Sequence, residues 1–260
     1  MTTTIAIAGK GGTGKTTIAG LLVRRLAALQ TGPVLAIDAD PASNLNEVLG
    51  LPLERTVGDI REEISEKARA NLLDPGVAKA DLLDYEINAN IVEGTGVDLL
   101  VMGRPEGPGC YCAANTMLRG IIDRIAAGYA WVVIDNEAGL EHLSRRTTRD
   151  VDVLLIVSDP SVRGLTTAGR IVDLLDELET RVGRHHLIIN RVVDGLTPEL
   201  ESGIGERGLN LLARIPEDPA VADYDAVGRA LVDLPRDAAM ARSVDDILEA
   251  LLASPAHKEA

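Results

Sequence analysis

The stretch "GKGGTGKTT", Gly9–Thr17, decides the fold, because it lies between the apolar run "IAIA" and the helical pattern "IAGLLVRRLAAL". Gly9, Gly14, Lys15 and Thr16 match the spacing G-x-x-x-x-G-K-[ST] of a phosphate-binding loop. The glycines allow positive φ angles, which turn backbone N–H groups toward phosphate oxygens. The helix that follows adds its positive N-terminal end. The stretch therefore predicts a strand, a phosphate-binding loop and a helix in succession.

Every position of this loop is a candidate ligand-binding residue. We expect Lys15 to contact the β- and γ-phosphates of a nucleotide and the Thr16 hydroxyl to ligate Mg²⁺. The candidate nucleotide-binding residues of the loop are Gly9, Lys10, Gly11, Gly12, Thr13, Gly14, Lys15, Thr16 and Thr17.

Short apolar runs alternate with helical patterns along the whole chain of 260 residues. The runs are "TIAIAG", "PVLAIDAD", "VDLLVMG", "WVVIDNE", "DVLLIVSD", "HHLIINRV" and "LNLLARIP". Strands that are apolar on both faces are typical of a buried parallel sheet. We therefore predict an α/β fold with a mostly parallel, twisted sheet and helices on both faces, and a single domain spanning residues 1–260. Functional residues should gather at the carboxyl ends of the strands.

Acidic residues stand where two of these runs end. "AIDADPASNL" places Asp38 and Asp40 two residues apart, so that both carboxylates lie on the same side of the strand. "WVVIDNEAGLEHL" places Asp135 at the end of another run. Asp38 and Asp135 are, with Thr16, the candidate residues for the Mg²⁺ shell.

Gly139 would allow the loop after Asp135 to move when the γ-phosphate leaves. Glu137 and Glu141 are candidate residues of this switch II loop, although either could be an ordinary surface residue.

Lys10, a lysine in addition to Lys15 and directly after the first glycine, gives the loop a resemblance to the deviant Walker A loop of the MinD/ParA, arsenical-pump and nitrogenase iron-protein superfamily. The resemblance implies an ATP-dependent homodimer in which Lys10 reaches the partner's nucleotide and Asp40 activates the attacking water. It also implies that Asn190 binds adenine beneath a loop containing Pro216 and Glu217. Without the family, Lys10 could be a solvated loop residue and Asn190 a turn residue. The candidate catalytic residues are Lys10, Lys15 and Asp40.

The chain has two cysteines, Cys110 and Cys112, on either side of Tyr111 and ahead of the helical pattern "NTMLRGIIDRIAAG". Three interpretations stand: small buried apolar residues, a strained redox disulfide, or half of a metal site. A closed Zn²⁺ site requires four ligands. A two-fold dimer would supply them, because each subunit brings the same pair to the axis.

The stretches "MGRPEGPGCYCAANTMLR" and "DNEAGLEHLSRRT" resemble those of the CooC-type ATPases, the maturation factors of nickel carbon monoxide dehydrogenases. The related acetyl-CoA synthase maturation factor shares the C-x-C pair. The resemblance implies ATP-driven nickel insertion into a client enzyme, with Cys110 and Cys112 as Zn²⁺ or Ni²⁺ ligands at the dimer interface. The segment Leu51–Gly96 has no counterpart in it.

A net charge of −14 argues against binding of nucleic acid. No segment approaches the roughly 18 to 20 apolar residues of a membrane span, and the N-terminal sequence lacks a basic export signal. We therefore expect a cytoplasmic protein with neither a nucleic-acid nor a membrane partner. Two alternatives remain open: a ParA/MinD-type partitioning or positioning ATPase, and an iron–sulfur redox ATPase like the nitrogenase iron protein.

Overall fold

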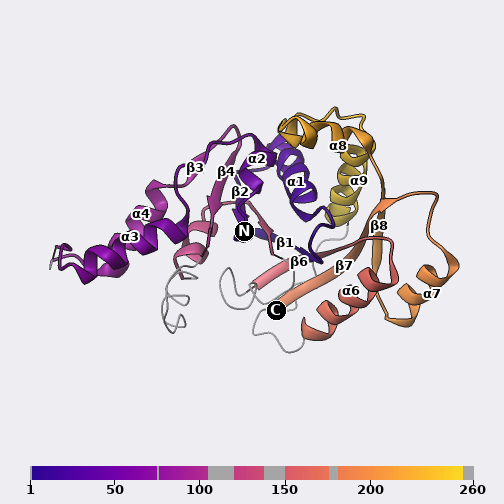
Figure 1. The fold of residues 1–260 in the computed structure, drawn as a ribbon, viewed down its shortest axis with the longest axis horizontal. Coiled ribbons are helices and arrows are strands. Elements are labelled where there is room, and N and C mark those ends of the chain that lie inside the picture. The colour runs from indigo at the N-terminus through magenta and orange to yellow at the C-terminus, as the bar shows by residue number, and fades with distance from the viewer. Residues whose placement is uncertain (1, 75, 105–119, 138–149, 176–180, 254–260) are drawn as a thin grey trace.

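The computed structural model describes residues 2–74, 76–104, 120–137, 150–175 and 181–253 (Figure 1). These residues form an eight-stranded sheet in the order β3-β4-β2-β5-β1-β6-β7-β8. Its strands are β1 (Thr3–Gly9), β2 (Val34–Asp38), β3 (Val92–Glu93), β4 (Val97–Val101), β5 (Trp131–Asp135), β6 (Asp150–Ser158), β7 (Arg181–Val192) and β8 (Leu211–Pro216).

All seven strands expected from the apolar runs are present, and they pair with one another in parallel. The two-residue strand β3 was not expected; it lies at the edge of the sheet and pairs with β4 in the antiparallel direction. The prediction of a mostly parallel sheet is therefore confirmed. Because the strands run the same way, the carboxyl ends of β1, β2, β5 and β6 lie along one edge of the sheet.

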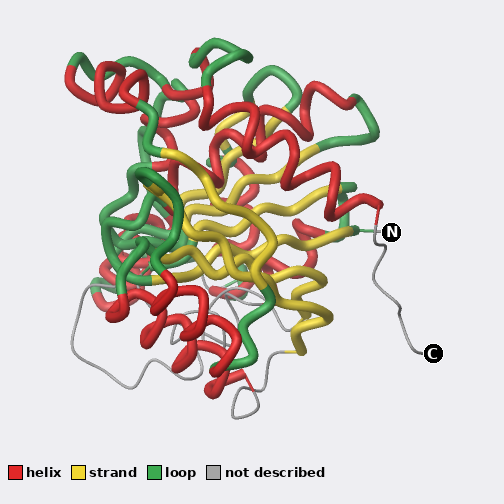
Figure 2. The backbone as a smooth tube through the Cα atoms, turned by 90° about the vertical axis from the view of Figure 1, so that its right-hand side faces the viewer, coloured by secondary structure: helices red, strands yellow, loops and turns green. Residues whose placement is uncertain are grey.

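Helices cover both faces of the sheet, as Figures 1 and 2 show. One face, the α1 face, is packed by α1 (Lys15–Leu29), α2 (Leu45–Leu49), α8 (Pro219–Ala226) and α9 (Ala239–Ala253). The opposite face, the α6 face, is packed by α3 (Val57–Arg69), α4 (Lys79–Ala89), a helical segment at 120–126, α6 (Val162–Leu175) and α7 (Pro198–Glu206). A short 3₁₀ helix, η2 (Leu231–Asp233), lies between α8 and α9 in the chain.

Helices α3 and α6 begin where the sequence provides side-chain caps. At the start of α6, the N-cap residue Ser161 accepts a hydrogen bond at its Oγ from the backbone N–H of Gly164, at 3.0 Å. Helix α3 lies in the segment Leu51–Gly96, for which the family resemblance had no counterpart. It begins with a capping box in which Thr56 and Asp59 bond to each other's backbone N–H groups.

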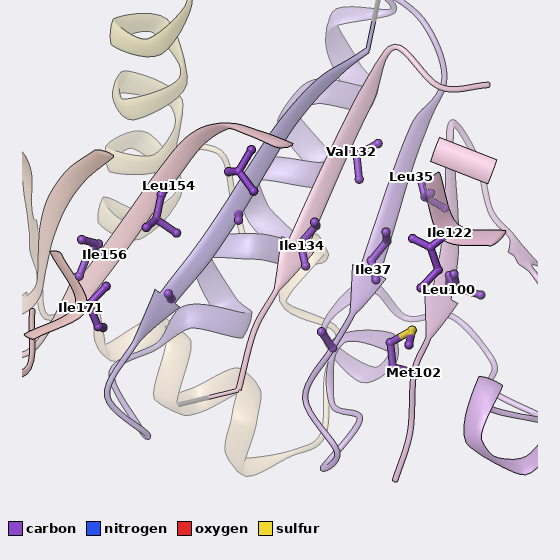
Figure 3. Close-up of a cluster of buried hydrophobic side chains, with 14 of the residues drawn as sticks. Leu35, Ile37, Leu100, Met102, Ile122, Val132, Ile134, Leu154, Ile156 and Ile171 are labelled. Carbon is purple, nitrogen blue, oxygen red and sulfur yellow. The ribbon is translucent and has the colours of Figure 1, made fainter. Parts of the chain in front are cut away.

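Alternating side chains of each strand enter the two layers of the core. In β1, Ile5 and Ile7 pack on the α1 face, whereas Ala6 and Ala8 face α6. Figure 3 shows part of the layer on the α6 face, including Leu35, Ile37, Leu100, Val132, Ile134, Leu154 and Ile156 from the strands and Ile171 from α6. The core is thus built from aliphatic side chains on both sides of the sheet.

Replacing Leu22 by alanine should destabilise the protein by about 2–5 kcal/mol, because this α1 side chain is fully buried and its removal leaves a cavity. Urea unfolding measures the change. The matched control is Leu72→Ala, whose side chain is 73% exposed and whose loss should change the unfolding free energy by about 0.5 kcal/mol or less. Equal losses for the two variants would contradict this packing.

Candidate functional site: a phosphate loop beside two buried carboxylates

The phosphate loop is held close to the sheet by two glycines. Gly9 has a φ of 146°, and a Cβ added to it would lie 2.1 Å from the carbonyl oxygen of Val157 on β6. Gly14, the residue before α1, has a φ of 91°, and its Cβ would lie 2.4 Å from Nδ2 of Asn190. L side chains rarely adopt these angles, so both positions require glycine.

Side chains fix the loop from within. The Thr13 hydroxyl donates a hydrogen bond to the carbonyl oxygen of Lys10 at 2.9 Å. The buried Lys15 ammonium lies 3.4 Å from the same oxygen. Asn190, at the end of β7, donates from Nδ2 to the carbonyl oxygen of Thr13 at 2.8 Å. The loop is therefore tied to β7 as well as to β1 and α1.

Two carboxylates lie buried side by side on the α1 face, next to the loop. Asp38 of β2 and Asp135 of β5 are register partners, and their side chains are 0% and 1% exposed. Asp38 accepts hydrogen bonds from the backbone N–H groups of Asp40 (3.0 Å) and Leu45 (2.9 Å). Asp135 Oδ1 is buried and has no hydrogen-bond partner among the residues that the structure describes.

Burial raises the pKa of both acids. Burial is the main cause for Asp38, whose pKa rises to about 6 despite the hydrogen bonds from Leu45 and Asp40. Burial also dominates for Asp135, and with the nearby charge of Asp38 it raises the pKa to about 7 against a hydrogen bond from Thr16. Paired buried carboxylates with an unpartnered oxygen are suited to a hard divalent cation such as Mg²⁺. The residues present thus fit the predicted ion.

The remaining acidic candidates lie farther out. Asp40 is partly exposed, and its Oδ1 accepts a hydrogen bond from the backbone N–H of Ala42 at 2.8 Å. Glu137 follows β5 and is half-buried.

The sequence did not lead us to predict one residue that contacts the candidate site, the ion-pair partner of Lys10. Lys10 Nζ lies 3.2 Å from the carboxylate of Asp159, at the end of β6. Burial alone would raise the pKa of Asp159, but hydrogen bonds from Ser161 and Lys10 outweigh it and hold the pKa below its usual value. Asp159 follows an apolar run just as Asp38 and Asp135 end theirs, so the same pattern could have identified it.

A pocket opens beside the loop, on the side of β7 and β8. Its volume is about 160 Å³, and its walls bring together the predicted residues Asn190, Pro216 and Glu217 with Gly14 and Thr17 of the loop. The sequence reading missed the other lining residues, which are Arg191, Asp218, Val221, Ala222, Asp225 and Met240. Several of them come from α8 and α9, which carry no motif.

The predicted thiolate pair, Cys110 and Cys112, lies outside the described residues, as do Gly139 and Glu141 of the stretch after β5. Within the described part of the chain, no group of three or more His, Cys, Asp or Glu side chains could hold a metal ion. No described helix is both long and apolar enough to cross a membrane.

A glycine loop between a strand and a helix, a buried lysine and two strand-end carboxylates define the P-loop nucleotide-binding proteins. The sequence pattern described as "CobQ/CobB/MinD/ParA nucleotide binding domain" matches residues 4–232, and the chain belongs to this family. It is a P-loop ATPase. An uncharacterized ATP-binding protein of Methanocaldococcus jannaschii is 45% identical over 95% of this chain and 98% of its own length. The carbon monoxide dehydrogenase accessory protein CooC of Rhodospirillum rubrum is 34% identical over 88% of this chain and 89% of its own.

Solved structures share the fold. The septum site-determining protein MinD of Pyrococcus horikoshii, complexed with Mg-ADP, has a TM-score of 0.69 at 22% identity and covers 100% of both chains. A ParA family ATPase from Chlorobium tepidum has a TM-score of 0.69 at 21% identity and covers 95% of this chain and 99% of its own. The predicted fold class is confirmed.

Asp135→Asn should stabilise the protein in the absence of nucleotide and Mg²⁺. The gain in the free energy of unfolding should be larger at higher pH. Because the pKa of Asp135 is raised, its carboxyl group binds a proton more tightly in the folded state than in the unfolded state. The contribution of Asp135 to the free energy of unfolding of the wild-type protein therefore falls as the pH rises from about 4 to 7. The advantage of Asp135→Asn should therefore grow by up to about 1.4 kcal/mol per pH unit across that window.

Urea unfolding in a chelator at pH 5 and pH 8 measures this difference. Asp246→Asn, an exposed substitution on α9, is the matched control. If Asp135→Asn changes the unfolding free energy equally at the two pH values, the assigned burial of its charge is wrong.

Proposed function

We propose that this chain is one ATPase domain that acts as a homodimeric metallochaperone, assisting nickel insertion into the active-site cluster of carbon monoxide dehydrogenase or acetyl-CoA synthase. One observation carries the proposal. The chain places Cys110 and Cys112 two residues apart and is 34% identical to the carbon monoxide dehydrogenase accessory protein CooC. The metal is the cargo of the reaction, and ATP supplies its driving force.

ATP would bind with its phosphates in the loop Gly9–Thr17 and its base in the pocket beside the loop, at the ends of β7 and β8. Lys15 is already buried beside the loop, where its charge would stabilise the β- and γ-phosphates. Thr16, Asp38 and Asp135 would hold Mg²⁺, which neutralises phosphate charge when bound. Two acids that are costly to ionise alone become favourable ligands once that ion is present.

Asp40 would orient and activate the attacking water. Its carboxylate is partly exposed at the edge where the loop and the two buried acids meet, so water can reach it. A buried acid such as Asp38 suits this role less well, because two backbone N–H groups already bind its oxygens. Asp38 would therefore ligate the metal ion, and Asp40 would activate the water.

Lys10 would act across the dimer. In the structure it pairs with Asp159 of its own chain, and their side chains are 47% and 31% exposed. An ion pair this exposed contributes on the order of 0–1 kcal/mol to stability. The phosphates of a nucleotide bound to the partner subunit could therefore replace Asp159 as the partner of Lys10. Lys10 would then link ATP binding to dimer formation, and dimer formation would bring the paired cysteines of two chains together.

The alternative is a partitioning or positioning ATPase, which the likeness to MinD and ParA structures favours. Such a protein would bind DNA or membranes when loaded with ATP. The acidic net charge of −14 makes a DNA surface unfavourable. ATP-dependent binding to DNA or liposomes, without metal binding, would support the alternative.

Asp40→Asn should lower the kcat of ATP hydrolysis by roughly 10²- to 10⁴-fold, the usual contribution of a general base, with little change in the affinity for ATP. Phosphate release and equilibrium binding measure the two quantities. Asp246→Asn is the control for the loss of one acid. A variant with unimpaired kcat would exclude Asp40 as the residue that activates water.

Cys112→Ser should abolish binding of Zn²⁺ or Ni²⁺ by the ATP-loaded dimer, because a four-thiolate site would lose two of its ligands. Tyr111→Phe changes the residue between the thiols and should leave metal content unchanged. Elemental analysis of anaerobically purified protein gives the metal content. Full metal binding by Cys112→Ser would refute the proposed site, and a brown protein containing iron and sulfide would favour the iron–sulfur alternative.

A further inference from the structure

We propose that Asp218 is a positioning residue that ties α8 to α9 and so fixes the apolar wall of the pocket for the nucleotide base. The inference rests on the ATP site proposed above. Asp218 directly follows Pro216 and Glu217 in the chain and lines the pocket with them. Its carboxylate binds the first turns of two helices that are distant in the sequence.

Each carboxylate oxygen of Asp218 accepts a hydrogen bond from a different helix. Oδ1 accepts from the backbone N–H of Ala220 at 3.0 Å, which makes Asp218 the N-cap of α8. Oδ2 accepts from the backbone N–H of Met240 at 2.9 Å, in the first turn of α9. The first N–H groups of a helix have no partners within it and favour a nearby negative charge. One carboxylate therefore caps two helices at once.

The residue before α9 cannot cap this helix. Helix α9 begins at Ala239, and the methyl side chain of Ala238 has no oxygen that could accept a hydrogen bond. Asp218 supplies the acceptor from a position 22 residues before Met240. The bond therefore joins the loop after β8 to the start of α9, in addition to capping a helix.

The two helices differ in how firmly they are packed. Helix α9 buries Met240, Ala241, Val244, Ile247, Leu248 and Leu251. None of the residues of α8, all of which the structure describes, is buried. Tyr224 of α8 donates a hydrogen bond from its hydroxyl to the carbonyl oxygen of Asp233, at 3.2 Å. A helix with so little buried surface opens easily, so the bond from Asp218 fastens α8 to a helix that the core holds in place.

Both helices supply walls of the base pocket. Val221 and Ala222 of α8 face the pocket together with Met240 of α9. The phosphate loop is held by other contacts, within itself and to the end of β7. A shift of α8 should therefore alter the base end of the site and leave its phosphate end as it is.

The test measures equilibrium binding of Mg-ATP and of base-free Mg-tripolyphosphate, by calorimetry, to the wild-type chain and to Asp218→Asn. Asparagine has nearly the same size, but it presents an oxygen to only one of the two helices and an NH₂ group to the other. We expect the affinity for Mg-ATP to fall roughly three- to tenfold, as for the loss of one net hydrogen bond, and the affinity for Mg-tripolyphosphate to stay unchanged. Asp223→Asn, an exposed change on α8 outside the pocket walls, should alter neither affinity.

Asp218→Ala removes both bonds and should lower the affinity for Mg-ATP further, again with no effect on Mg-tripolyphosphate. Hydrogen–deuterium exchange gives a second measurement, because the amides of α8 should exchange faster in both variants while those of α1 keep the wild-type rate. Unchanged affinity for Mg-ATP in both variants would overturn the proposal, and so would an equal fall for Mg-ATP and Mg-tripolyphosphate. A wild-type chain that binds neither ligand would instead refute the nucleotide site itself, and the proposal with it.

Discussion

Two buried carboxylates share one edge of the sheet, and their uncompensated burial is the constraint on which the proposed cation site depends. Asp38 and Asp135 are register partners on neighbouring strands, fully buried, with raised pKa values of about 6 and 7. Charge this deep in a protein needs a counter-charge. The phosphate loop lies on the same face, with Lys15 buried beside it. Lys15 and a bound Mg²⁺ would supply the positive charge that both the carboxylates and the phosphates of a nucleotide need.

Much of this could be predicted from the sequence because the signals are local. A parallel strand that is buried on both sides is a short aliphatic run, and all seven such runs became strands. The loop motif and the aspartates at strand ends fall at one sheet edge by topology alone. Helix α1, Lys15–Leu29, contains the predicted helical pattern Ile18–Leu29 for the same reason: the glycine loop starts the helix and its apolar pattern extends it.

Other features depend on contacts between distant segments, which no local pattern records. Asp159 meets Lys10 only after β6 pairs with β1, and Asn190 meets Thr13 across two strands. The pocket walls from α8 and α9 are likewise brought in by packing. The role of Cys110 and Cys112 stays a prediction, because both cysteines lie outside the described residues. The one-domain organisation also stays a prediction.

The central claim is that ATP brings two chains together around one metal ion. Native mass spectrometry of the anaerobic wild-type protein, with Zn²⁺ or Ni²⁺ and either Mg-ATP or no nucleotide, tests it most directly. We predict a dimer carrying two nucleotides and one metal ion when ATP is present, and a metal-free monomer without nucleotide. A monomer that binds metal regardless of nucleotide, or an ATP-loaded dimer without metal, would contradict the claim.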